Sequence, residues 1–378
     1  MRVAIACLAL SFLGAWGCSS GSQILSYENR ELGPEPTSTT ETFTVPIENT
    51  TLRIGIAVEA KLSDGTATLR LSRGESEPLL DKTFAVGAGS EAVVLPAVEE
   101  PTEILAVVEL TDAIGQWEIA VVHIAPQSSL YLYLVSGLLV FAIVISAIRW
   151  VRRRFSARWR WLWVGAGLWF VAVALKATSA LLLNEVVLES LEDLLPRWGY
   201  LVAGSAYVGF QSALFEVGLT IVAALIWRRL CASPARAINI GIGAGAFEAA
   251  LVGVAPMAGV VAAFVGHELT TVALAHQSVI TPVAWMVAPI ERALTIPAHV
   301  ASRVLIFYGV ADKRIAPIAA GFALFMGIDM VGGGAHVAKL VGHISMWWIE
   351  LAIVPFAVIS LFALRWVIAR WQPEDRVR

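Results

Sequence analysis

Ionisable residues stand inside long apolar stretches of this 378-residue chain, where a charged side chain is costly to keep. Five of them lie 12 to 16 positions from the arginine or lysine that bounds their stretch, namely Lys176, Glu216, Glu248, His299 and Asp329. At about 1.5 Å per helical residue, all five lie roughly 18–24 Å from one surface. Three carboxylates and a histidine in one layer of low dielectric could share protons, hold a cation or activate a water. We therefore predict a site in this layer; the alternative is a buried ion-pair network that only holds the helices together.

Further polar residues in the stretch 284–310 are expected to support this layer. Glu291 and His299 are eight positions apart, so they share a helix face, and Arg303 follows His299 by another four. Arg292 and Lys176 are the expected counter-ions of the carboxylates.

The elements that position these residues are expected to be membrane-spanning helices. The chain is 57% hydrophobic and 15% charged, which excludes both an ordinary soluble enzyme and a disordered protein. The stretches long enough to cross a bilayer lie near 129–148, 161–183, 199–227, 237–265, 284–310, 315–338 and 345–368. Basic loops follow the first, third, fifth and seventh stretches, so the positive-inside rule places those loops in the cytoplasm. The segment around His267 and His276 is then an outer loop.

The N-terminal part has a different character. Residues 23–126 hold 17 acidic and 6 basic residues, whereas residues 128–378 hold 13 acidic and 20 basic ones. Residues 1–18 are expected to be a secretory signal, because one positive charge precedes an apolar run. The end of that run resembles a bacterial lipoprotein cleavage site, in which Cys18 would be acylated; ordinary cleavage and a retained anchor stay open. We expect a multi-pass protein of the bacterial cytoplasmic (inner) membrane, with residues 23–126 outside, 128–370 in the membrane and 371–378 as a cytoplasmic tail.

Residues 23–126 alternate between apolar and polar positions, which predicts about seven short antiparallel strands in a β-sandwich or jelly roll. Ser63-Asp64-Gly65 is expected to turn the chain, and a last hairpin is expected around 112–115. The fold class is therefore two-part, with an all-β sandwich outside the membrane and an all-α bundle of about seven transmembrane helices. The sandwich carries no cluster with metal-ligand spacing, so we interpret it as a binding or shielding module whose partner is unknown.

Glycines at alternate positions, Gly241, Gly243 and Gly245, could suggest a dinucleotide fingerprint. No strand precedes them and they lie inside an apolar stretch, so we interpret them as sites of close helix packing. We expect no nucleic-acid partner.

Three segments together resemble the motifs of the YhfC-type family of intramembrane peptidases, relatives of the CAAX-processing and bacteriocin-processing membrane proteases. The resemblance covers roughly residues 130–370. The first motif keeps Glu216 but has Val217 where a second Glu is usual, and it lacks the usual Arg. The second keeps Glu248 but has Ala244 where a His is usual. The third, Glu291-Arg292 followed by His299, is intact.

The resemblance implies hydrolysis of a membrane peptide or protein substrate inside the lipid bilayer. Glu216 would be the general base on a water, His299 would polarise the carbonyl or stabilise the oxyanion, and Glu248 and Asp329 would orient the water or His299. Zinc sites usually contain more His or Cys than this layer offers. A metal-free glutamate site is therefore favoured, and a divalent metal stays the alternative cofactor.

Two other functions remain open. The residues missing from the first two motifs would suit a non-catalytic relative that binds membrane peptides or acts as a scaffold. The three carboxylates would also suit a proton-coupled secondary transporter, although the stretches show no inverted repeat.

Overall fold

A computed structural model describes residues 24–32, 35–47, 53–73, 77–95, 102–124, 130–155, 158–281, 283–341 and 344–371. The chain divides into two compact units. One comprises residues 1–135 and 255–285, and the other comprises residues 136–254 and 286–378. The expected signal and Cys18 lie outside the described residues, as does the expected cytoplasmic tail apart from Trp371.

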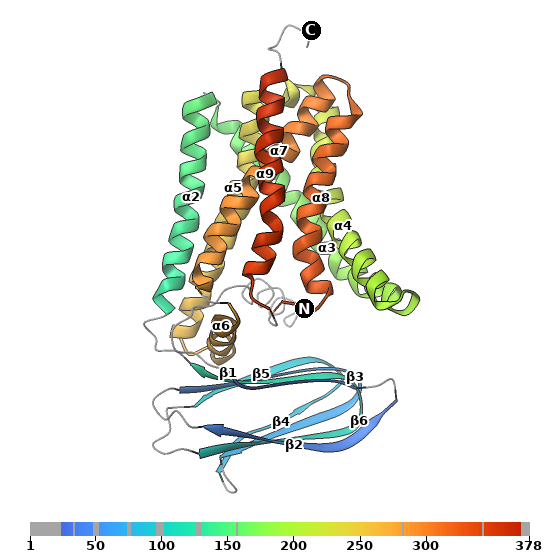
Figure 1. The fold of residues 1–378 in the computed structure, drawn as a ribbon, viewed down its shortest axis with the longest axis vertical. Helices are drawn as coiled ribbons and strands as arrows, with labels where there is room; N and C mark the ends of the chain where they lie inside the picture. Colours follow the sequence, from blue (N-terminus) through green and yellow to red (C-terminus); the bar gives the residue numbers. More distant parts are fainter. Residues whose placement is uncertain are drawn as a thin grey trace. The chain divides into compact units, whose positions relative to one another are not determined.

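The first unit contains an antiparallel β structure, which confirms the predicted class of the N-terminal part. Its described strands are β1 (Ile24–Glu31), β2 (Thr37–Ile47), β3 (Arg53–Arg73), β4 (Glu77–Phe84), β5 (Gly87–Leu95) and β6 (Thr102–Ile124). The long strands β3 and β6 pair with each other along almost their whole length. β1 and β5 flank one end of this pair, and β2 and β4 flank the other. Figure 1 shows the strands folded into two layers.

The expected turns at Ser63-Asp64-Gly65 and around 112–115 are wrong. β3 and β6 continue through these positions as bent strands, with register shifts on both sides of Asp64. Gly65 and Gly115 have φ values of +73° and +141°, a region in which glycine is favoured. The polar, glycine-containing breaks therefore bend two long strands from one layer into the other, where the sequence suggested that four short strands ended.

The inner faces of the layers follow the alternation of the sequence. Ile54, Ile56 and Val58 of β3 are at most 4% exposed, and so is Trp117 of β6. The Trp117 ring packs against Phe43 of β2 with ring centroids 5.5 Å apart. Burial of these side chains provides the main stabilisation of the β structure, because apolar area removed from water contributes about 25 cal/mol per Å².

The segment expected as an outer loop contains a helix instead. Helix α6 (Glu268–Ile280) packs Val272 and Ala275 against Val122 and Ile124 of β6. Its buried residues include Val272 at 0% exposure, and a Cβ atom on Gly55 of β3 would lie 2.7 Å from the Val272 side chain. The outer face of one β layer is apolar here, and this face gives the helix a surface on which to form.

The remaining long helices confirm the predicted bundle. They are α2 (Tyr131–Phe155), α3 (Trp159–Leu194), α4 (Arg197–Ile226), α5 (Pro234–Phe264), α7 (Val287–Ala311), α8 (Ile315–Val337) and α9 (Trp347–Arg370). Seven helical segments among the described residues are long and apolar enough to cross a membrane, and the protein is a multi-pass membrane protein. The short helices η2 (Arg228–Cys231) and η3 (Ala284–Met286) precede α5 and α7.

The glycines of α5 allow close helix packing, as predicted. A Cβ atom on Gly243 would lie 2.0 Å from the carbonyl oxygen of Leu162 in α3. Cβ atoms on Gly241 and Gly245 would lie 2.7 Å from Val300 and 3.0 Å from His299, both in α7. Backbone-to-backbone contact thus brings α3 and α7 against α5, which carries Glu248.

Substitution of Gly165 in α3 is expected to destabilise the bundle, since a Cβ atom there would lie 1.9 Å from the carbonyl oxygen of Ile240. Gly165→Ala should cost about 1–3 kcal/mol through overpacking. Gly167→Ala is the matched control on the same helix, because no atom lies within 4 Å of its Cβ position. This control should be neutral or stabilise by up to about 1 kcal/mol. Thermal unfolding of the purified variants in detergent tests the difference, and equal melting temperatures would contradict the close contact.

Cys231 in η2 is a buried free thiol. Burial raises its pKa to about 11, so the thiol stays protonated at neutral pH. It is therefore unsuited to act as a catalytic nucleophile.

Candidate active site

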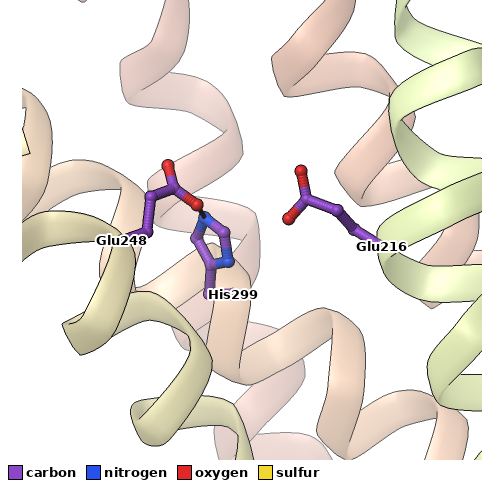
Figure 2. A group of neighbouring side chains, drawn as sticks. All are labelled: Glu216, Glu248 and His299. Carbon is purple, nitrogen blue, oxygen red and sulfur yellow. Dashed lines mark ion pairs between the residues drawn. The ribbon is translucent and has the colours of Figure 1, made fainter. Parts of the chain in front are cut away.

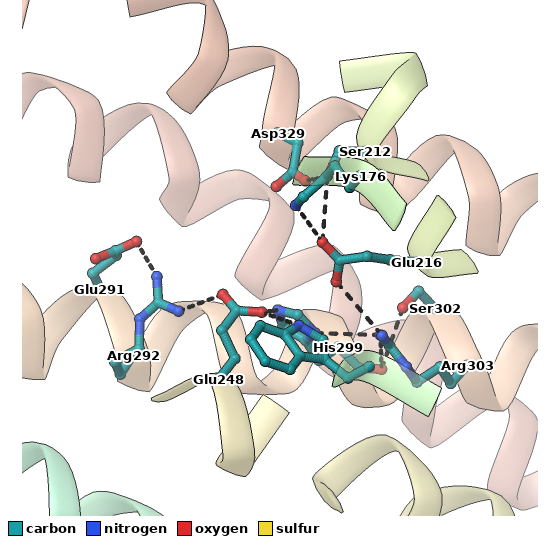
Figure 3. Close-up of polar contacts among 11 residues, drawn as sticks. Lys176, Ser212, Glu216, Glu248, Glu291, Arg292, His299, Ser302, Arg303 and Asp329 are labelled. Carbon is teal, nitrogen blue, oxygen red and sulfur yellow. Dashed lines mark hydrogen bonds and ion pairs between the residues drawn. The ribbon is translucent and has the colours of Figure 1, made fainter. Parts of the chain in front are cut away.

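The five polar residues predicted to share one depth do lie in one region of the second unit (Figure 3). Each comes from a different helix. Lys176 is on α3, Glu216 on α4, Glu248 on α5, His299 on α7 and Asp329 on α8. Lys176 pairs with Glu216 and Glu248 with His299, and Arg303 of α7 connects the two pairs. Asp329 is joined to the first pair through Ser212.

The centre of the region is formed by Glu216, Glu248 and His299 (Figure 2). One potential ligand atom from each residue lies within 4.8 Å of the other two. Glu216 and His299 are 3% and 5% exposed, and the Glu248 side chain is partly exposed at 21%. Two carboxylates and an imidazole therefore converge in the interior of the helix bundle.

Glu248 orients His299 and is itself held from two other sides. Its Oε2 atom lies 3.0 Å from Nε2 of His299 and accepts a hydrogen bond of 2.8 Å from Nε1 of Trp169. Its Oε1 atom accepts a hydrogen bond of 2.6 Å from Arg292, which also pairs with Glu291. The expected support by Glu291 and Arg292 thus reaches His299 through Glu248.

Glu216 is held on one oxygen only. Its Oε1 atom accepts a hydrogen bond of 2.6 Å from Nζ of Lys176. Its Oε2 atom is buried and has no hydrogen-bond partner among the described residues; the nearest recorded cation is Arg303, at 3.7 Å. Leaving a buried carboxylate oxygen without a donor costs free energy, so this atom is suited to a ligand that the folded chain does not itself supply.

Asp329 belongs to the second layer around Glu216. Its Oδ2 atom accepts a hydrogen bond from the Ser212 hydroxyl, and Lys176 donates to the same Ser212 oxygen at 3.0 Å. The expected orientation of the water or of His299 by Asp329 therefore has no direct contact to support it. Asp329 can act on Glu216 through Ser212 and Lys176.

Arg303 is a central residue that the depth count omitted. It is 1% exposed, and its Nη1 atom lies 3.3 Å from Nδ1 of His299. A guanidinium only donates hydrogen bonds, so in this contact Nδ1 is the acceptor. The proton of a neutral His299 then lies on Nε2, where it faces the Glu248 carboxylate.

Ser212 and Trp169 also donate hydrogen bonds within the site. Sequence spacing could have identified Ser212 but not Trp169. Ser212 is four residues before Glu216 and Arg303 four after His299, so each shares a helix face with a predicted residue. Trp169 carries no charge, and nothing in its spacing separates it from the other aromatic residues of α3.

Glu350 of α9, which was not among the residues predicted from the sequence, is 4% exposed and interacts electrostatically with Glu291 and Arg292.

Removal of the Trp169 indole donor should leave the Glu248 carboxylate less firmly held and lower the stability of the protein. Trp169→Phe keeps a ring against Phe247, whose centroid lies 5.6 Å away, but loses the hydrogen bond to Oε2. Because that bond reaches a charged group, we expect a loss of about 1.5–3 kcal/mol in stability. The control is Trp163→Phe on the same helix, where the side chain is 69% exposed and little change is expected. Equal thermal unfolding of the two variants would argue against this contact.

The arrangement fits a divalent cation that takes the place of the Nε2 proton of His299, since metal binding to such ligands releases protons. Glu216 Oε2 is a buried oxygen without a donor, and Glu248 and His299 supply a second oxygen and a nitrogen within 4.8 Å. Carboxylate and imidazole donors together suit zinc, iron or manganese. The same oxygen can accept a hydrogen bond from a water molecule, so the preference for a metal-free site stays a prediction.

Comparison with known families agrees with the geometry. No curated protein matches the chain. The model of one family, described as YhfC intramembrane metalloprotease, matches residues 139–354, which is more than half of the chain and includes Lys176, Glu216, Glu248, His299 and Asp329. The chain therefore belongs to the YhfC intramembrane metalloprotease family.

Proposed function

We propose that this protein hydrolyses a peptide bond of a membrane-embedded peptide or protein at the Glu216–Glu248–His299 cluster. The observation that carries the proposal is the buried Glu216 Oε2 atom, which lacks a hydrogen-bond donor and lies beside an oriented imidazole. A carboxylate oxygen in this position can accept a proton from an attacking water. Family membership supports the reaction class.

The proposed reaction uses the fixed hydrogen bonds of the site. Water attacks the carbonyl carbon of the scissile bond, and its proton passes to Glu216 Oε2. Lys176 holds the other oxygen of Glu216 at 2.6 Å and keeps the carboxylate in place. As the C–N bond breaks, Glu216 passes the proton to the leaving nitrogen.

We propose that Arg303 donates to the oxyanion that forms during the attack, and that the Nε2–H group of His299 is shared between Glu248 and the oxyanion. Glu248 holds Nε2 of His299 at 3.0 Å, and Arg303 lies between His299 and Glu216. Preorganised donors of this kind stabilise developing charge more strongly in a water-poor interior than in solution. When bound by Glu216, Glu248 and His299, a divalent cation would polarise the carbonyl and make the attacking water more acidic.

The proposed setting is the cytoplasmic membrane of a bacterium, with the β structure outside. The basic residues Arg152, Arg153 and Arg154 in the last turn of α2 support this orientation through the positive-inside rule. In this orientation the strands would act as a binding module that presents a substrate or another partner at the outer side.

A non-catalytic, peptide-binding role is the second candidate. Val217 and Ala244 are fully buried apolar residues at positions where related motifs have Glu and His. Each is an apolar residue where those motifs have a polar one, so the chain offers fewer polar groups for catalysis. A scaffold would retain partners without needing the Glu216 carboxylate.

Cell membranes that contain the wild-type chain or the Glu216→Gln variant separate these two roles. Mass spectrometry of the membrane fraction should find new peptide C-termini within apolar host segments only with the wild-type chain. Proteins that co-purify equally with both forms, together with no new termini, would favour the scaffold and overturn the proposal.

A further inference from the structure

An apolar groove of about 570 Å³ is lined by residues of α2, α5, α7 and α9 in the second unit. Figure 1 shows these four helices. The volume of the groove is in the range of small-molecule sites in proteins. Apart from two arginines, every lining side chain is aliphatic, aromatic or proline. The arginines are Arg154 of α2 and Arg365 of α9.

The groove has a polar end and an apolar end. Arg154 is in the last turn of α2, on the side with the basic loops. Ile296 and Pro297, which also line the groove, lie about 15 residues from the end of α7 at Ala311. At about 1.5 Å per residue this is roughly 22 Å, so the groove reaches from the basic side toward the middle of a hydrocarbon core about 30 Å thick.

The two arginines are available to an anion. Both are exposed, and neither has a carboxylate partner within 4.0 Å among the described residues. Guanidinium groups bind phosphate through paired, charge-assisted hydrogen bonds, and basic pockets between membrane helices bind anionic lipid head groups. The apolar lining extends from these arginines toward the middle of the bilayer. Its length and character suit an acyl chain of one leaflet.

We propose that this groove binds an anionic phospholipid of the cytoplasmic leaflet, with its phosphate on Arg154 and Arg365 and an acyl chain along α5 and α7. A peptide helix would fill the apolar wall but gives no reason for two cations that have no carboxylate partner among the described residues. Ile296 and Val300 flank His299 along α7, so the bound lipid contacts the helix that carries the imidazole. The proposal does not depend on peptidase activity.

Lipid retention by the full chain tests the proposal. The protein is reconstituted with equal phosphatidylglycerol and phosphatidylcholine, repurified, and its bound lipids are counted by mass spectrometry. The wild-type chain should retain phosphatidylglycerol preferentially, and Arg154→Gln/Arg365→Gln should weaken this retention about thirtyfold, as expected for the loss of two surface cations. The control Arg158→Gln/Arg229→Gln removes two exposed arginines that follow the first and third apolar stretches and do not line the groove.

A second variant tests the apolar wall without a change of charge. Ala147→Trp places a large side chain in the groove and should also abolish preferential retention. Equal loss in the control double variant, or normal retention by Ala147→Trp, would show that lipid binds only to the basic surface and would overturn the proposal. Retention of a membrane peptide in place of lipid, or displacement of the lipid by inorganic phosphate alone, would overturn it as well.

Discussion

Glu216→Gln is expected to reduce cleavage of a membrane peptide by at least about 100-fold, because the amide oxygen cannot accept the proton of the attacking water. The substitution keeps the shape of the side chain and can keep an oxygen toward Lys176, which donates to Oε1 at 2.6 Å. The Oε2 position, which has no hydrogen-bond donor among the described residues, is the one that changes its chemistry. Purified protein in vesicles, assayed with a reporter peptide that spans the membrane, gives the rate.

The matched control for this variant is Glu291→Gln. It makes the same change in the same network, on a side chain that is 22% exposed and pairs with Arg292 on the side away from His299. Its rate should stay within about threefold of the wild-type rate. If Glu291→Gln loses as much activity as Glu216→Gln while both variants still fold, then the network acts as a structural unit and Glu216 is not the proton acceptor.

His299→Ala is expected to lower the cleavage rate by about 100- to 1000-fold. This is the effect typical of removing a group that stabilises the oxyanion. Removal of the imidazole also leaves Glu248 Oε2 without its contact at 3.0 Å to Nε2. Part of the lower rate would therefore come from a less well oriented Glu248 carboxylate. Size-exclusion chromatography and thermal unfolding check that the variant folds. Metal analysis of the same samples gives a second readout, since a cation held by the cluster would be lost with the imidazole.

His336→Ala is the control for the histidine substitution. His336 is an exposed residue near the end of α8 and has no recorded contact with the cluster. The His336→Ala variant should cleave the reporter peptide at the same rate as the wild-type chain. Full activity of His299→Ala would show that the imidazole has no part in the reaction, whatever its position in the bundle.

The layer of polar residues could be predicted because helices rise by a constant amount per residue. Counting from the basic ends brought Glu216, Glu248 and His299 to one depth, and the structure places them within 4.8 Å. The count was not applied to Glu350, although this buried residue of α9 lies 15 positions from Arg365. It also omitted Arg303, because an arginine near the end of an apolar stretch resembles a boundary residue and its burial depends on packing between helices.

The sequence predicted the all-β class of the N-terminal part, but not the path of its strands. Alternation identifies which residues face the interior, and Ile54, Ile56 and Val58 are buried as expected. It does not distinguish a turn from a bend, since Gly65 would suit either. Helix α6 was missed because it is short and its docking surface, around Val122 and Ile124, comes from a strand distant in sequence.

Incorporation of heavy oxygen from water tests the central claim most directly. Purified protein in vesicles is incubated with membrane peptides in H₂¹⁸O, and mass spectrometry follows the new C-termini. The wild-type chain should produce termini that carry one ¹⁸O atom from the attacking water, and Glu216→Gln should produce none above background. Absence of labelled termini with folded wild-type protein and a panel of membrane peptides, or equal labelling by Glu216→Gln, would contradict the assignment of peptide hydrolysis to this cluster.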